Sequence, residues 1–306
     1  MSVRRRAFLG LAAAAGAAAA TGTVLASAHA EPATPRQTAP TEPFGIGVRQ
    51  YEWNRGDRRL VTRVFYPSTG EPTGVPVDDA PIADGPFPVV EWSHGLGGNP
   101  GSYAPHILPL AEAGFIVPAP VFPTTSTGTE GDIGDVYNGN QSMDVSEVIT
   151  RTLALNESDA AFAGRIDTAA GVGVAGHSLG GMTTHGLLTA WPDDRVVAAI
   201  PFACVDMGDP APQVSAKVLF VHGDQDPICD YALARQAYDE LPPVKAFMTH
   251  TGVGHDEFIW DGPTYDQAVA TSLDWMRWSL YGDTAARDRL PEDASGEGIV
   301  WESELG

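Results

Sequence analysis

The sequence predicts an α/β fold in which a mostly parallel central sheet carries helices on both faces. Short apolar runs alternate with helical patterns from residue 87 onward. The runs are apolar throughout rather than at every second position, as is typical of parallel strands buried on both faces. The chain has 306 residues, which is enough for one α/β domain with a large core.

The elements follow one another in a simple order. Two β-rich runs, Gly45–Trp53 and Leu60–Tyr66, flank the polar turn Asn54–Arg59 and predict an antiparallel edge hairpin. The strands expected after this hairpin are Phe87–Trp92, Phe115–Ala119, Val172–Ala175, Val196–Pro201, Val218–His222 and Val244–His250. The helices expected between and after them are Tyr103–Ala113, Ser142–Leu155, Leu179–Trp191, Tyr231–Leu241 and Thr264–Tyr281.

The first thirty residues are typical of a targeting segment. The run Arg4–Leu9 resembles the twin-arginine export signal, and an alanine-rich apolar stretch then leads to the A-x-A cleavage site Ala28–Ala30. We therefore expect export and secretion, with an N-terminal membrane anchor as the alternative. The expected organisation is a signal peptide over 1–30, a flexible leader over 31–43, the α/β domain over 44–283 and an acidic C-terminal tail over 284–306.

The charge of the chain restricts its partners. The formal net charge is −21, and removal of Arg4, Arg5 and Arg6 with the signal makes it more negative still. Such a body repels nucleic acid, anionic membrane surfaces and phosphorylated metabolites. We expect a neutral substrate, no nucleic-acid partner, and no stable membrane insertion once the signal is removed.

The two cysteines, Cys204 and Cys229, each follow a predicted strand. If those strands are neighbours, a disulfide between the two residues joins the loops beyond them, which suits an oxidising compartment. Two buried free thiols are the alternative. Neither cysteine has metal-ligand spacing, and Asp132 with Asp135 matches no calcium loop, so no metal is expected.

The candidate nucleophile lies in the run Gly176–Gly181, with the letters GHSLGG, directly after the apolar strand Val172–Ala175. This is a G-x-S-x-G nucleophile elbow in the setting that it requires, a strand that leads into a helix. The glycines permit the sharp turn that exposes the Ser178 hydroxyl. A glycine-rich turn with an incidental serine is the alternative.

Chain order then selects the partners of the serine, because in this topology the acid and then the histidine follow it. Of the two histidines late enough, His250 lies within a predicted strand, whereas His255 lies in a glycine-containing loop beyond the strand end. We therefore expect His255 to be the base. The acid follows strand 218–222, where Asp226 is favoured and Asp224 competes. Asp256 adjoins the base and is excluded.

An oxyanion hole is expected in Ser93–Gly98, the glycine-rich loop that follows the strand Phe87–Trp92. Backbone N–H groups there and just after the nucleophile are placed to bind a developing oxyanion. We assign the N–H groups of Leu96 and Leu179 as the donors.

With these residues in view, nearly all of the chain after the signal resembles the α/β-hydrolase superfamily. The segments Arg63–Pro67 and Pro88–Gly98, the Asp144-Val145 block at a helix start and the elbow look like secreted esterases of the platelet-activating-factor acetylhydrolase and dienelactone-hydrolase-like groups. The resemblance implies a serine esterase that needs no cofactor.

The elbow is also similar to the GHSMGG of actinobacterial cutinases and polyester hydrolases. In those enzymes a Pro-Trp pair after the next strand helps to clamp an aromatic ester, and Pro201-Phe202 occupies that place here. The resemblance thus makes Phe202 a candidate substrate contact. Two departures separate the chain from these groups. Dienelactone hydrolases use cysteine where this chain has Ser178, and cutinases lack the dipeptide His94-Gly95 in their oxyanion segment.

Two connections shape the expected substrate site. Phe202–Ala216 is too short for a helical lid, so we expect no large cap domain and an open active site. The polar connection 121–141 is long enough to be functional, and we expect it to border the pocket with Tyr137 as a contact.

The sequence therefore predicts a secreted carboxylic-ester hydrolase. Ser178, His255 and Asp226 would act through an acyl-enzyme on neutral esters, polyesters included, without a cofactor. An acyltransferase, or a lactone, amide or thioester hydrolase with the same triad, is the first alternative. A non-catalytic binding protein on a hydrolase-like fold is the second.

Overall fold

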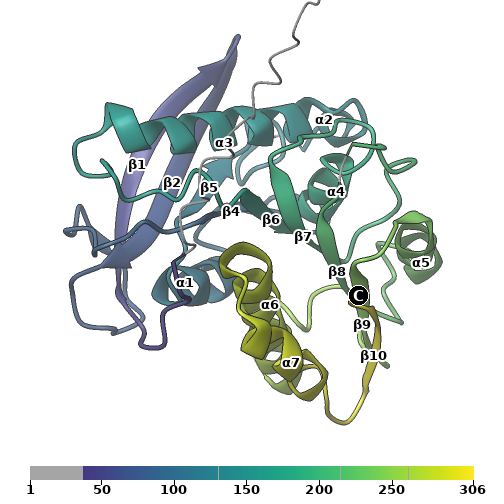
Figure 1. The fold of residues 1–306 in the computed structure, drawn as a ribbon. Coiled ribbons are helices and arrows are strands. Elements are labelled where there is room, and N and C mark those ends of the chain that lie inside the picture. Colours follow the sequence, from purple (N-terminus) through teal and green to yellow (C-terminus); the bar gives the residue numbers. More distant parts are fainter. Residues whose placement is uncertain (1–36, 130, 214, 261) are drawn as a thin grey trace, which may run out of the picture. The chain divides into compact units, whose positions relative to one another are not determined.

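The computed structural model describes residues 37–306 apart from 130, 214 and 261, and this part of the chain has an α/β fold (Figure 1). The predicted signal peptide and the first six residues of the predicted leader lie outside the described residues. The described end of that leader has no regular secondary structure, yet Ala39 is buried in the hydrophobic core. The folded domain therefore begins before the expected residue 44.

One sheet has six strands in the order β10-β9-β8-β7-β6-β4. The neighbours from β4 to β9 are parallel, and β10 is antiparallel to β9. The strands are β4 (Val89–Ser93), β6 (Val172–His177), β7 (Val196–Phe202), β8 (Lys217–Gly223), β9 (Lys245–His250) and β10 (Ile299–Glu304). Because the parallel strands share one direction, the loops after β4, β6, β8 and β9 meet at their carboxyl edge.

A second sheet has four strands in the order β3-β1-β2-β5. Its strands are β1 (Gly45–Arg55), β2 (Arg58–Ser68), β3 (Val77–Asp78) and β5 (Val117–Val121). β1 and β2 form the predicted hairpin, and β5 pairs antiparallel with β2. The two sheets meet where the N–H of Val90 donates to the carbonyl of Ile116.

The prediction of one mostly parallel sheet is therefore too simple, since both sheets are mixed. β5 pairs with one side of the hairpin, along β2, and the two-residue strand β3 pairs with β1 only at Gly47 and Val48. β5 was expected within the parallel set, but its apolar run does not reveal its pairing direction. An apolar strand reads the same in either orientation.

Helices cover both faces of the six-stranded sheet, as predicted (Figure 1). Successive strand residues face opposite sides: Leu219 and Val221 pack with α1 and α6, whereas Val218 and Phe220 pack with α4 and α5. The helices are α1 (Ala104–Glu112), α2 (Gly134–Tyr137), α3 (Asn140–Ser158), α4 (Leu179–Gly186), α5 (Tyr231–Glu240), α6 (Pro263–Met276), the π-helical turn η1 (Arg277–Tyr281) and α7 (Thr284–Asp293). None of the helices described combines the length and the apolar character that crossing a lipid bilayer demands.

The C-terminal segment corrects another prediction. Residues 284–306 were expected to form an acidic surface tail, but they form α7 and β10. Ala286 and Leu290, four residues apart, are both fully buried, so one face of α7 belongs to the core. β10 is held by its main chain along β9, from Ile299 opposite His250 to Glu304 opposite Lys245. Main-chain pairing carries little hydrophobic signal, which is why the polar sequence concealed it.

Candidate active site

Ser178 occupies the junction between β6, which ends at His177, and α4, which begins at Leu179. Its backbone has φ 58° and ψ −122°, a conformation that side-chain-bearing residues rarely adopt. The N–H of Ser178 donates to the carbonyl of Phe202 at 3.0 Å, which fixes the turn against β7. A strained residue at a strand-to-helix junction is the geometry of a nucleophile elbow.

The elbow is pressed against the end of β4, and this close approach requires a glycine. A Cβ at Gly180 would lie 2.1 Å from the carbonyl oxygen of Ser93. The same closeness brings the loop after β4 to the nucleophile, because a Cβ at Gly95 would lie 3.2 Å from the Cβ of Ser178.

Asp226 and His255 form a direct pair, although they come from the loops after β8 and β9. Nδ1 of His255 is 2.6 Å from Oδ2 of Asp226. Since an ionised carboxylate only accepts, Nδ1 carries the proton and Nε2 is left as an acceptor. Both side chains are buried, His255 keeping 8% of its surface exposed. The His255 imidazole is therefore held in one orientation with little exposure to solvent.

The Asp226 carboxylate is charged because four donors surround it. Oδ1 accepts the N–H groups of Ile228 at 2.7 Å and Cys229 at 2.9 Å. Oδ2 lies 3.3 Å from Nε2 of the buried His222, in addition to its contact with His255. Burial alone raises the pKa of Asp226, but the hydrogen bonds from His222, His255 and the two backbone groups outweigh burial and lower it. A charged carboxylate in this place stabilises an imidazolium.

Asp224, the competing acid, does not contact His255. Its Oδ1 accepts the N–H of Gly252 at 2.6 Å and so ties the loop after β8 to the loop after β9. The N–H of Asp224 also donates to the carbonyl of His250. The structure therefore separates the two aspartates: Asp226 reaches the base, and Asp224 joins the two loops that carry the pair.

The predicted disulfide is wrong, since Cys204 and Cys229 are both buried free thiols. The two side chains have different surroundings. A Cβ built at Gly181 would meet the Cβ of Cys204 at 3.2 Å, so Cys204 packs against α4. The Cys229 sulfur lies within 4.8 Å of ligand atoms of Asp226 and His255.

Cys229 and Ser178 line the same cavity. Burial, reinforced by the charge of Asp226, raises the pKa of Cys229 to about 12. The group is therefore a neutral thiol and a poor nucleophile. Within the described chain, the Ser178 hydroxyl does not bond to His255 in this conformation, although both side chains line one cavity.

The two expected oxyanion donors lie at that cavity. Leu179 is the first residue of α4, and N–H groups of a first helical turn have no partner within the helix. In the loop after β4, the N–H groups of Gly95, Gly97 and Gly98 donate to Tyr103, Thr125 and Gly95, respectively. The N–H of Leu96, which lies between them, has no hydrogen-bond acceptor among the described residues.

The cavity has a volume of about 610 Å³ and an apolar rim. Its rim includes large apolar side chains that are 44–68% exposed: Leu96, Ile133, Tyr137, Ile228 and Trp260. Tyr137, in α2, lies in the long connection before α3 and lines this cavity, so that connection borders the pocket as expected. The described residues between β7 and β8 contain no helix, in keeping with the expected lack of a cap.

Phe202 corrects a further prediction, because it does not line the cavity. The side chain is fully buried and packs among Trp92, His106 and Phe258. Its position in β7 turns it toward the α1 and α6 face of the sheet, away from the substrate side. Its carbonyl nevertheless supports the site by accepting the Ser178 N–H.

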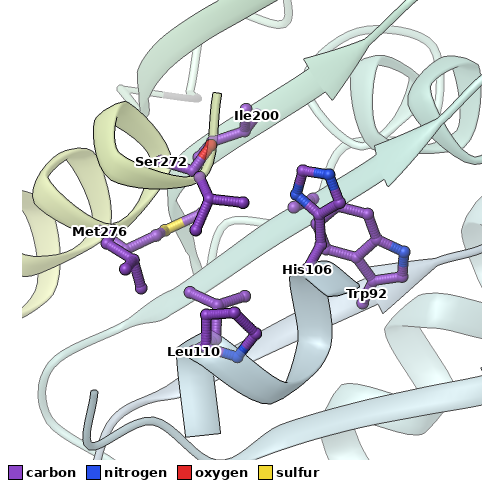
Figure 2. Close-up of a pocket in the computed structure, with 10 residues that line it drawn as sticks. Trp92, His106, Leu110, Ile200, Ser272 and Met276 are labelled. Atoms are coloured by element: carbon purple, nitrogen blue, oxygen red, sulfur yellow. The ribbon is translucent and has the colours of Figure 1, made fainter. Parts of the chain in front are cut away.

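A second cavity lies between α1 and α6, against the face of the sheet that these helices cover (Figure 2). Its lining is almost entirely apolar, and His106 stacks on Trp92 at 4.9 Å beside it. The volume is about 10 Å³, at the lower limit for one water molecule. This cavity is a packing gap in the core and holds no substrate.

Sequence reasoning did not assign a role to three buried side chains beside His255 and Asp226. His177 contacts His255, His222 contacts Asp226, and Tyr103 contacts His177. His222 bonds the carbonyl of Cys229 at 3.0 Å while it contacts Asp226. His177 lies inside the elbow motif and so had a signal in the sequence. Tyr103 had none, because it contacts His177, which is distant in the chain. His222 contacts Asp226 and Cys229 only four and seven residues later, but the sequence does not show which way its side chain turns.

Comparison of the sequence with protein families and with curated proteins found no match.

Proposed function

We propose that the protein is a carboxylic-ester hydrolase with the triad Ser178, His255 and Asp226, built on an α/β-hydrolase fold. The observation that carries the proposal is that Ser178, in its strained turn, and His255 line one cavity. Nδ1 of His255 is in turn 2.6 Å from the Asp226 carboxylate. The parallel strands β4 and β6–β9 and the chain order of the triad support the fold assignment.

The reaction begins with a change of rotamer. Among the described residues, His255 bonds Asp226 through Nδ1 and has no hydrogen bond to the Ser178 hydroxyl, although both side chains line one cavity. Rotation about χ1 moves a serine hydroxyl between staggered positions at little cost, and catalytic hydrogen bonds often tighten only when substrate binds. In the reacting state Ser178 donates its proton to Nε2 of His255 and attacks the ester carbonyl.

His255 then carries the proton through both half-reactions. As imidazolium it is stabilised by Asp226, and it protonates the leaving alcohol. A water molecule next gives its proton to His255, attacks the acyl-enzyme and releases the carboxylic acid with Ser178 restored. The N–H groups of Leu96 and Leu179 bind the oxyanion in both steps.

The surroundings of the site favour a neutral, largely apolar ester. The net charge of −21 opposes the approach of anions, and the rim side chains are apolar. The cavity is open, so the ester can belong to a bulky molecule, and neutral polyesters are among the candidate substrates. Secretion by the twin-arginine route remains a prediction from Arg4–Leu9, which lie outside the described residues.

Turnover of a p-nitrophenyl short-chain ester tests the proposal. Ser178→Ala should lose at least about 10³-fold in kcat, because the nucleophile is gone, while the thermal melt stays close to that of the wild type. Ser279→Ala is a matched control, since the Ser279 hydroxyl is buried in η1 without a recorded hydrogen-bond partner. Retained activity in a contaminant-free Ser178→Ala preparation would remove Ser178 from its role.

A further inference from the structure

Three consecutive hydrogen bonds link the oxyanion loop to the backbone of the proposed base. The N–H of Gly95 is 3.1 Å from the Tyr103 hydroxyl, and that hydroxyl is 3.0 Å from Nδ1 of His177. Nε2 of His177 is 2.9 Å from the carbonyl oxygen of His255. The path joins the loop after β4, the start of α1, the end of β6 and the loop after β9.

Only one proton arrangement satisfies this path. The amide of Gly95 must donate, and the carbonyl of His255 must accept. His177 therefore carries its proton on Nε2, which makes Nδ1 an acceptor, and Tyr103 must donate its hydroxyl proton to Nδ1. Every group then has a partner of the correct polarity.

Burial keeps this arrangement fixed across the working pH range. Tyr103 and His177 keep only 5% and 2% of their surface exposed. Burial, together with the neighbouring His255, lowers the pKa of His177 to about 3, and burial raises the pKa of Tyr103 to about 12. Both residues are therefore neutral. The other titratable groups that face His177 are His106, Asp226, His255 and Asp256, whose carboxylate is 3.7 Å from Nε2.

We propose that Tyr103 and His177 are positioning residues, whose bridge sets the oxyanion loop and His255 at the separation that the reaction requires. Neither exchanges a proton with substrate. This bridge of Tyr103 and His177 acts through the backbone at both ends. Tyr103 accepts the N–H of Gly95, the residue before Leu96, and His177 donates to the carbonyl of His255. This role rests on the proposed function, in which a misplacement of about 1 Å costs about 10²-fold in rate.

Tyr103→Phe breaks both bonds of the hydroxyl and keeps the ring, which packs on Trp92 and His177. We expect kcat for a p-nitrophenyl short-chain ester to fall roughly 10- to 100-fold with KM changed less than about threefold. Tyr265→Phe is the matched control, because it also removes a tyrosine hydroxyl that donates one hydrogen bond, here to the backbone carbonyl of Pro105 at 2.7 Å and outside the bridge. If kcat of Tyr103→Phe is as high as kcat of Tyr265→Phe, the bridge does not position the site.

Two substitutions of His177 separate the halves of the bridge. The glutamine amide reaches the Nε2 position and keeps a donor for the His255 carbonyl, whereas the asparagine amide reaches only the Nδ1 position. We therefore expect kcat to fall roughly tenfold further in His177→Asn than in His177→Gln. Equal losses in the two variants would contradict a role for the bond to His255.

A spectroscopic measurement separates this proposal from the proposed function. In long-range proton–nitrogen NMR of the wild type, the His177 signal, assigned through its loss in His177→Gln, should be that of a neutral Nε2–H imidazole that does not titrate between about pH 5 and about pH 9. A titrating or Nδ1–H His177 overturns the bridge even if the enzyme hydrolyses esters. If the wild type hydrolyses no ester, both the proposed function and the positioning role are wrong. The NMR spectrum still decides in that case whether the hydrogen-bonded bridge exists.

Discussion

Exchange of Asp226 for asparagine isolates the charge of the acid while it preserves the fold. The asparagine oxygen can keep the backbone N–H groups of Ile228 and Cys229, which Oδ1 of Asp226 accepts. Its amide nitrogen then faces His255 as a donor, so Nδ1 must become an acceptor and Nε2 takes the proton. A base already protonated at Nε2 cannot accept the proton of Ser178.

The structure gives the size of the effect. Opposite unit charges separated by the 2.6 Å between Nδ1 of His255 and Oδ2 of Asp226 attract by about 6 kcal/mol at an effective dielectric constant of about 20. Asp226→Asn removes that attraction from the imidazolium of the transition state. A loss of about 10⁴-fold in kcat, or about 5 kcal/mol, is therefore expected.

Asp224→Asn supplies the matched control in the same turn. The asparagine oxygen still accepts the N–H of Gly252, and Asp224 has no contact with His255. Its kcat should stay within about fivefold of the wild type. The assay is initial-rate hydrolysis of a p-nitrophenyl short-chain ester, with a thermal melt of each variant. A larger loss in Asp224→Asn than in Asp226→Asn would refute the assignment of the acid.

Two further predictions concern the fold. Gly180→Ala places a Cβ about 2.1 Å from the backbone carbonyl of Ser93, which cannot yield, so thermal denaturation should show a Tm lowered by more than about 10 °C. Gly70→Ala, whose Cβ would meet only the Ser68 hydroxyl at 3.5 Å, should melt close to the wild type. Burial and the nearby Asp274 raise the pKa of Asp293 to about 7, so its contribution to stability is lost as pH rises through that value. Asp293→Asn should therefore melt above the wild type at about pH 8.5, with a smaller difference at about pH 4, and an equal difference at both pH values would contradict the shifted titration.

Hydrophobic patterning was enough to predict most of the elements. Each predicted strand from 87 to 250 overlaps a strand in the structure, because buried parallel strands are long apolar runs. The same signal fails where pairing depends on the main chain. β10 (Ile299–Glu304) is half polar and none of its residues is fully buried, and β5 (Val117–Val121) joins the antiparallel sheet despite its apolar run.

The site divides in a similar way. The positions of Ser178, His255 and Asp226 could be predicted because motif and chain order restrict them to a few loops. Phe202 could not be placed, since one residue of strand register decides which face of β7 it joins. The thiols of Cys204 and Cys229 needed side-chain directions that no spacing provides. Tyr103 was invisible, because its contacts reach seventy-four residues along the chain to His177.

The most direct test of the account is covalent labelling with a fluorophosphonate, followed by peptide mass spectrometry. Activation of Ser178 by His255 predicts a single phosphonylated residue at Ser178, with labelling slowed by at least about 10²-fold in His255→Ala. A label on any other residue, or equal labelling of the wild type and His255→Ala, would contradict the claim that these side chains form one nucleophilic site.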